Sequence, residues 1–234
     1  MTQFSLHYLL ERLAQSNPQA YEPYLAMSYN NLANLYSDTQ RFSESEAMHK
    51  LALAIHERLA QSNPQVYESA LAASYNNLAI LYSDTQRFAE CEEMFKQALA
   101  IHERLSQSNP QAYEPDLAMS YNNLAIVYYK TQRFSESEAM YKQALAIRER
   151  LAQSNPQAYE PDLAMSYYTL AILYSDTQRF AECEAMFKQA LALYVRLAQY
   201  NPQAYEPALA LSYNNLANLY YNTQRFSESE AMYK

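Results

Sequence analysis

The chain repeats itself every 46 residues. The segment RLAQSNPQAYEP at 12–23 returns as RLAQSNPQVYES at 58–69, RLSQSNPQAYEP at 104–115, RLAQSNPQAYEP at 150–161 and RLAQYNPQAYEP at 196–207. A fixed period of this size is typical of arrays in which one small supersecondary unit stacks on the next. The 234 residues are therefore interpreted as copies of one unit.

The amino-acid composition indicates that this unit is helical. The sequence contains no glycine, which phosphate-binding and dinucleotide-binding loops need for tight turns and which β-rich proteins use between strands. Alanine, leucine, glutamate and glutamine dominate the periodic stretches, and all of them favour helix. We expect an all-α fold without a glycine-rich nucleotide site.

One period contains two amphipathic helices. Apolar residues recur at helical spacing in both halves, at Leu25, Tyr29, Leu32, Ala33, Leu35 and Tyr36, and then at Met48, Leu51, Ala52, Ile55 and Leu59. The short TQRF link permits only an antiparallel hairpin, whose two helices are called A and B. Because Pro23 cannot receive an intrahelical hydrogen bond, we expect a short turn at 18–21 and helix A proper from Glu22 or Pro23.

The period predicts a single array over residues 1–234. Its expected parts are a partial helix B at 1–16, helix A/B pairs at 20–61, 66–107, 112–153 and 158–199, and helix A with a truncated helix B at 204–234. Alanine occupies the register of Ala33 in all five copies and that of Ala52 in all four. Small residues at fixed places on both helices predict close approach of the backbones.

The repeat resembles a known family. The pattern Tyr29-x2-Leu32-Ala33-x2-Tyr36, followed by Ser45, His49 and Ala52, is similar to the tetratricopeptide repeat. The wording YNNLANLY…RFSESEAMYKQALAI resembles the longer repeats of kinesin light chain and 46-residue arrays of large bacterial signalling proteins. The resemblance implies a right-handed superhelical solenoid of antiparallel helix pairs, acting as a non-enzymatic scaffold for a protein or peptide and forming part of a larger bacterial signalling protein.

The chain departs from the family at the turn between helices A and B. The period is 46 rather than 34, and the family's turn glycine is replaced by glutamine at positions 40, 86, 132, 178 and 224. A left-handed glutamine costs roughly 1 kcal/mol. The alternative is that the turn is rebuilt.

The resemblance also implies a binding groove lined by the A helices. In such repeats the second asparagine of an Asn-Asn pair bonds the backbone of a bound peptide, which corresponds to Asn31, Asn77, Asn123 and Asn215. The fourth copy has Thr169 instead. The alternative is that these amides are solvated or bond the next helix.

Positions on the expected groove vary between copies, whereas core positions barely vary. One stripe has isoleucine at its centre (Ile80, Ile126 and Ile172), and another is mostly acidic (Asp84, Lys130 and Asp176). The pattern predicts a partner with apolar anchors and net positive charge. For the isoleucines, the alternative is packing between helices.

No residue pattern points to catalysis. The net charge of −8 disfavours nucleic acid, and no apolar run approaches the length of a membrane span. Cys91 and Cys183 do not form a disulfide framework, which favours the cytoplasm, and they alternate with serines at a small-residue position of helix B. His56 and His102 share a register with Arg148 and Tyr194, which suggests a solvated face. We expect no enzyme activity, no cofactor and no metal site.

A second function remains open, in which the chain is a structural array that associates end to end. Both termini fall inside a helix B, so the last A helix is expected to lack full cover. The residues expected to be left open are Tyr213, Leu216, Leu219 and Tyr220, which would pack against Phe4, Tyr8 and Leu9 of a second molecule. Such head-to-tail contacts generate chains.

Overall fold

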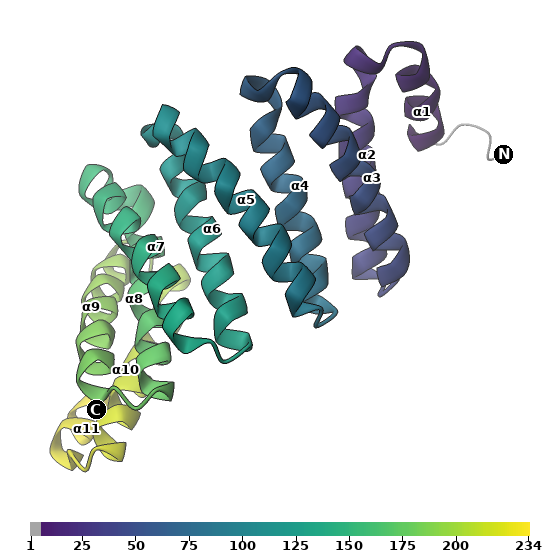
Figure 1. The fold of residues 1–234 in the computed structure, drawn as a ribbon. Coiled ribbons are helices and arrows are strands. Elements are labelled where there is room, and N and C mark those ends of the chain that lie inside the picture. The colour runs from purple at the N-terminus through teal and green to yellow at the C-terminus, as the bar shows by residue number, and fades with distance from the viewer. Residues whose placement is uncertain (1–5) are drawn as a thin grey trace. The chain divides into compact units, whose positions relative to one another are not determined.

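The computed structural model describes residues 6–234, which form helices joined by short links and contain no strand (Figure 1). The A helices are α2 (Pro18–Asp38), α4 (Pro64–Asp84), α6 (Pro110–Lys130), α8 (Pro156–Asp176) and α10 (Pro202–Asn222). The B helices are α1 (Leu6–Ser16), α3 (Phe42–Ser62), α5 (Phe88–Ser108), α7 (Phe134–Ser154), α9 (Phe180–Tyr200) and α11 (Phe226–Tyr233). The expected all-α architecture of helix pairs is confirmed.

Two residues after the end of each A helix, a glutamine adopts a left-handed backbone conformation. Gln40 has φ 60°, and Gln86, Gln132, Gln178 and Gln224 have φ 59°, 59°, 58° and 61°. The N–H of Arg41 donates to the carbonyl of Tyr36, and the N–H of Gln40 to that of Ser37, both at 2.8 Å. This is a Schellman motif, which requires a positive φ at Gln40. The turn is therefore not rebuilt around the missing glycine, and the glutamines carry its strain.

The A helices begin earlier than the sequence predicts. The expected turn at 18–21 is wrong, because α2 is continuous from Pro18 and contains Pro23. Asn17 caps the helix by accepting a hydrogen bond from the N–H of Ala20 at 3.3 Å, and Pro18 occupies the first helical position. Pro23 removes only the bond to the carbonyl of Gln19, whose side chain is exposed, so water can satisfy that carbonyl.

The chain forms two compact units, residues up to Tyr113 and Glu114–Lys234. In unit 1, helices α1 to α5 each pack on the next, and α2 also touches α4. In unit 2, helices α7 to α11 pack in the same consecutive way. The Ser137 hydroxyl of α7 donates to the Ala125 carbonyl of α6 at 2.9 Å, which ties these two helices together.

The core of each unit is built around the alanines that the repeat keeps constant. Ala33 and Ala79 of unit 1, and Ala125, Ala171 and Ala217 of unit 2, have no exposed surface. Cys91 and Cys183 are also fully buried, which confirms that this small-residue register is a contact between helices. Any added methylene at these positions has to displace a neighbouring helix.

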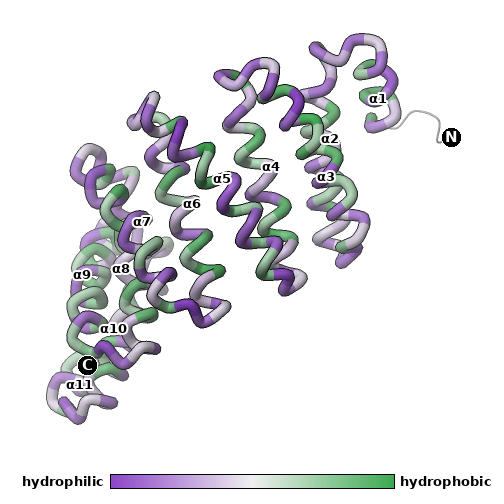
Figure 2. Tube along the Cα trace, in the orientation of Figure 1, coloured by the Kyte–Doolittle hydropathy of each residue, from purple (hydrophilic) through white to green (hydrophobic). Residues whose placement is uncertain are grey.

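Hydrophilic and hydrophobic segments alternate along every helix (Figure 2). This pattern is typical of helices that bury one face and expose the other. None of the helices in residues 6–234 combines the length and the apolar character that crossing a membrane requires.

Candidate protein-interaction site

Unit 2 exposes apolar side chains at one register of its A helices. Met119 on α6, Met165 on α8 and Leu211 on α10 are 43%, 49% and 48% exposed. Four residues further along the same helices lie Asn123, Thr169 and Asn215. These six residues are called the A-helix face. The three helices are neighbours, because side chains of α8 bond both α6 and α10.

Two of the four predicted asparagines lie on this face, and their environments differ. Asn215 donates its amide hydrogen to the Tyr168 hydroxyl at 2.6 Å, so this amide bonds a neighbouring A helix. Asn123 is half-buried. Thr169 donates to the carbonyl of Ser166 at 3.1 Å and presents only a small side chain.

Tyr168 borders the A-helix face, next to Thr169 in the chain, and the sequence reasoning missed it. The other copies have asparagine at its register, namely Asn30, Asn76, Asn122 and Asn214. Its ring packs edge-on against Phe187, with centroids 5.7 Å apart, while its hydroxyl reaches Asn215. Its departure from the repeat was the sequence signal that could have identified it.

The rim of the A-helix face contains a hydrogen-bonded tyrosine and aspartate. Tyr129 of α6 donates to the carboxylate of Asp176 on α8. This bond, together with burial, raises the pKa of Tyr129 to about 12. Lys130 is exposed beside Tyr129. Ile126 and Ile172 lie behind the rim, half-buried against the core of unit 2.

Unit 1 presents the same registers on α2 and α4. Ile80 is 50% exposed and Met27 is 55% exposed. Asn31 and Asp84 are exposed, whereas Asn77 is half-buried. A hollow of about 210 Å³ lies between α1 and α2, lined by Leu6, Leu10, Tyr24, Met27, Ser28 and Asn31. The predicted residues of this unit are therefore accessible in part.

His56 on α3 and His102 on α5 are buried, which corrects the expectation of a solvated face. His56 and His102 are only 8% and 3% exposed. His56 Nδ1 lies 2.6 Å from the Ser74 hydroxyl on α4, because a B helix packs against the following A helix as well as its own. At the same register Arg148 donates to Ser166 at 2.6 Å. This register is a contact between successive pairs.

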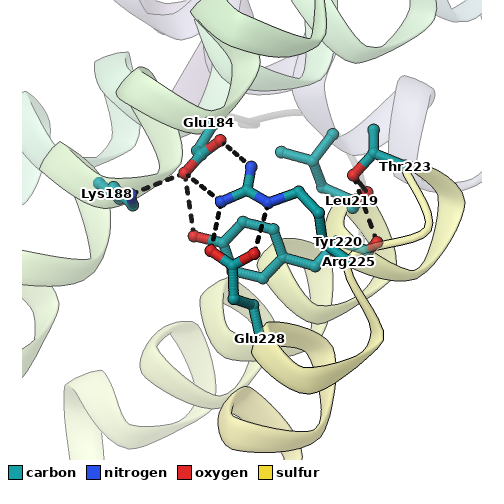
Figure 3. A network of polar contacts seen from close by, with 7 residues as sticks. All are labelled: Glu184, Lys188, Leu219, Tyr220, Thr223, Arg225 and Glu228. Atoms are coloured by element: carbon teal, nitrogen blue, oxygen red, sulfur yellow. Dashed lines mark hydrogen bonds and ion pairs between the residues drawn. The ribbon is translucent and has the colours of Figure 1, made fainter.

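Ion pairs connect successive pairs at the turns. Glu184 of α9 binds Arg225 at the start of α11 at 2.5 Å, Lys188 at 2.6 Å and the Tyr220 hydroxyl at 3.1 Å (Figure 3). The hydrogen bond from Arg225, supported by those from Lys188 and Tyr220, lowers the pKa of Glu184 to about 2. Glu46 and Glu138 occupy the same register and bind Arg87 and Arg179. The Arg225 guanidinium also lies 4.3 Å from the Tyr220 ring centroid.

The residues expected to lie open on the last A helix are mostly buried. Leu216, Leu219 and Tyr220 are 2%, 5% and 3% exposed, because α9 and α11 together enclose them in the core of unit 2. Of the four residues expected to lie open, only Tyr213 lines a hollow, which has a volume of about 520 Å³ and lies between α10 and α11. On α1, Tyr8 and Leu9 are 48% and 37% exposed, and Phe4 lies outside the described residues. The expectation that these apolar residues of α10 lack cover is therefore wrong for Leu216, Leu219 and Tyr220.

The described residues offer little reactive chemistry. Within residues 6–234, no group of three histidine, cysteine, aspartate or glutamate side chains is arranged to hold a metal ion. Neither cysteine is in a disulfide, and burial raises the pKa of Cys183 to about 11, which disfavours the reactive thiolate. What the A-helix face can do is bind, through apolar surface and side-chain amides.

Comparisons with known sequences point to one family. Two family models, both described as Tetratricopeptide repeat, match the chain, one at residues 70–150 and the other at 25–64, 163–202 and 209–234. A search of curated proteins gave no significant match.

Solved structures share the fold at low sequence identity. BtubC (BKLC) from P. vanneervenii is 24% identical with a TM-score of 0.74, over 97% of this chain and 83% of that one. A protein from Podosopora anserina, described as a kinesin light chain with nearly identical TPR-like repeats, is 22% identical with a TM-score of 0.68, over 90% and 92%. The MamA protein is 12% identical with a TM-score of 0.57, over 89% and 87%.

Proposed function

The chain belongs to the tetratricopeptide repeat family, and from this premise we propose that it is a non-enzymatic scaffold that binds a protein or peptide on its A-helix face. Repeats of this family generally mediate protein interactions or self-assembly. Two buried cysteines outside any disulfide are compatible with a reducing cytoplasm, where we place the protein.

One observation carries the proposal: Met119, Met165 and Leu211 are each exposed by 43% to 49% at one register of three neighbouring A helices. Folding gains little from side chains that are left in water. A row of exposed apolar side chains bordered by polar residues is typical of a protein interaction site. Methionine suits this use, because its flexible side chain adapts to different partner surfaces.

The partner's chemistry follows from the groups around the row. The A-helix face offers amide and hydroxyl groups at Asn123 and Thr169, which suit an extended backbone. Its rim carries the Asp176 carboxylate, and the whole chain has a net charge of −8. We therefore expect a segment with one or two apolar anchors and a net positive charge.

Photo-crosslinking tests this proposal and identifies the partner segment. A photoreactive phenylalanine analogue replaces Met165 on the A-helix face or, as the control, Gln189, an exposed residue of α9. Crosslinks at 165 but not at 189, mapped to one segment of one partner, are expected. The affinity of that synthetic segment is then measured for wild type and for Asn123→Ala, which should weaken binding by about 1 kcal/mol.

Two outcomes would contradict the proposal. Equal crosslinking at both positions would show that the A-helix face has no preference for the partner. Crosslinks from 165 only to other copies of this chain, with sedimentation coefficients that rise with concentration, would favour the structural array instead.

A further inference from the structure

The last residue of α9, in unit 2, departs from the repeat. The B helices α1, α3, α5 and α7 all end in serine, at positions 16, 62, 108 and 154, and each hydroxyl donates to the carbonyl three residues earlier at 2.7 or 2.8 Å. Helix α9 ends in Tyr200 instead, and this side chain is 83% exposed. A ring left so open to water gains little from folding, so its presence needs another reason.

Tyr200 lies at a hollow of about 660 Å³ formed by the ends of three helices. The lining consists of Pro156, Gln157 and Glu160 from α8, Arg196, Leu197 and Tyr200 from α9, Asn201 from the link, and Tyr205 from α10. This hollow lies at the joint between helix pairs and shares no residue with the A-helix face. Its lining includes two tyrosines, a leucine and a proline, which carry apolar surface.

The repeat provides an internal comparison for this hollow. In unit 1 the corresponding residues are Pro64, Gln65, Glu68, Arg104, Leu105, Ser108, Asn109 and Tyr113. The two sets differ only at the position of Tyr200 and Ser108. The ion pair recurs as well, because Arg104 binds Glu68 at 2.8 Å as Arg196 binds Glu160 at 2.6 Å. Among the eight residues that line the hollow, Tyr200 is therefore the one that differs from its counterpart in unit 1.

The hollow offers several hydrogen-bond donors, and the charges of Arg196 and Glu160 offset each other. Arg196 holds Glu160 through two bonds, of 2.6 Å and 3.1 Å, and the Arg196 side chain is 50% exposed while the Glu160 side chain is only 15% exposed. The Asn201 oxygen accepts the N–H of Ala204 at 3.2 Å, so its amino group is the part left to donate. The hollow therefore suits a neutral occupant that brings hydrogen-bond acceptors and apolar rings.

We infer that this hollow binds a proline-rich segment in the polyproline II conformation. The prolines of such a segment have no backbone N–H to donate. Its carbonyls make no internal hydrogen bonds and can accept them from Arg196, Asn201 and the tyrosine hydroxyls. Its rings pack against aromatic side chains, as in other grooves that recognise proline-rich peptides. A charged ligand is disfavoured, because the Arg196 and Glu160 charges already neutralise each other.

Chemical-shift mapping with a defined probe tests the inference. A capped oligoproline of about ten residues is titrated into isotopically labelled protein, and saturable shifts are expected at the amides of Tyr200, Asn201 and Tyr205. Tyr200→Ser, which restores the residue of the other four joints, should weaken binding about tenfold or more. The thermal melt of this variant should match that of wild type, since the ring is exposed.

A second variant tests whether the tyrosine is sufficient to create a binding site. Ser108→Tyr in unit 1 completes a second copy of the same eight residues, so oligoproline should then also shift the amides around Asn109. Three results would overturn the inference: no saturable shift in wild type, equal affinity of wild type and Tyr200→Ser, or shifts at Tyr200 on dilution without peptide, which would show that a second copy of the chain fills the hollow.

Discussion

At the scale of single residues, His49 is a base that folding keeps neutral. It is 3% exposed on α3, and its Nδ1 lies 3.0 Å from the Asn30 oxygen on α2. Burial lowers the pKa of His49 to about 4, and it lowers the pKa of His56 as well. Unfolding releases both side chains to water, where a histidine has a pKa of about 6.5.

We expect unit 1 to lose stability in mild acid for this reason. Above pH 6.5 neither state binds the proton, so the stabilising contribution is complete; between about pH 6.5 and 4 the unfolded chain alone takes up protons. Urea unfolding should show a loss on the order of 1–2 kcal/mol between about pH 7 and pH 5.

The control variant is His49→Phe, because Phe95 and Phe187 occupy this register in other copies. It should reduce the acid-induced loss while leaving the stability at neutral pH close to that of wild type. An unchanged pH dependence would show that His49 is not the responsible group.

A missing carboxylate at position 195 allows a second test at this scale. A tyrosine near the middle of three A helices donates to a glutamate on the preceding B helix, from Tyr29 to Glu11 at 3.1 Å, from Tyr75 to Glu57 at 2.8 Å and from Tyr167 to Glu149 at 2.6 Å. Before Tyr213 the corresponding residue is Val195. Val195→Glu should therefore stabilise unit 2 by about 1 kcal/mol.

A double-mutant cycle checks this assignment. In a Tyr213→Phe background the glutamate has no hydroxyl donor, so the gain in unfolding free energy should disappear. An equal gain in both backgrounds would contradict the proposed hydrogen bond.

The sequence predicted buried apolar residues better than buried polar ones. The alanines at the registers of Ala33 and Ala52 were expected to be contacts and are buried, because only small side chains recur there. His56 and His102 were expected in water, because their register also holds Arg148 and Tyr194. Long polar side chains can reach partners such as Ser74 across a helix contact, and residue type alone does not reveal this.

At the scale of the element, the turn between helices A and B stores strain. Gln132 has φ 59°, in a Schellman turn that glycine adopts without a Cβ penalty. Gln132→Gly should raise the unfolding free energy by about 0.5–1 kcal/mol, the relief of strain being reduced by the greater freedom of glycine in the unfolded chain.

Gln143 offers a matched control with the opposite sign. It is exposed in the middle of α7, where glycine costs about 1 kcal/mol relative to good helix formers. Chemical denaturation of the two variants should move in opposite directions. Destabilisation by both would show that the glutamine turn is not strained.

Helix boundaries were less predictable than helix identity. The periodicity correctly indicated two helices per period, but Pro23 suggested a later start than Pro18. The proline rule applies strongly in a helix interior, whereas near the N-terminus only one carbonyl, that of Gln19, loses its partner. Asn17 and Pro18 at the cap outweigh that loss, and the printed sequence does not show this balance.

At the scale of the whole molecule, an array of this kind transmits perturbations mainly between neighbours. Glu184 connects α9, α10 and the start of α11 through Tyr220 and Arg225 (Figure 3). Because its pKa is lowered to about 2, its contribution is present above about pH 4.5 and is lost as the pH falls towards 2. Glu184→Gln should cost about 1–2 kcal/mol at neutral pH.

Hydrogen exchange locates the consequence of that change. Amides of α9 to α11 should exchange faster in Glu184→Gln, while those of α2 and α3 should not change. Glu228→Gln, which removes a surface partner of the same Arg225, should have little effect. Uniformly faster exchange along the chain would contradict coupling limited to neighbouring pairs.

The candidate site was predictable from the sequence only in part. The resemblance to the family led to Asn123, and the varying registers of the A helices led to Asp176, because a repeated chain shows its own deviations. The bond between Asn215 and Tyr168 was not predicted, since it depends on two residues 47 positions apart on neighbouring helices. Which amides are engaged and which face water is a property of packing.

The most direct test of the interaction scaffold exchanges methionine and glutamine on two surfaces of unit 2. Met119→Gln with Met165→Gln alters the A-helix face, and Gln143→Met with Gln189→Met alters exposed positions of the B helices α7 and α9. Calorimetric titration with the crosslinked partner segment should show about tenfold or greater weakening for the first pair and unchanged affinity for the second, with thermal melts like that of wild type. Wild-type affinity in the first pair, or weakening only in the second, would contradict binding at the A-helix face.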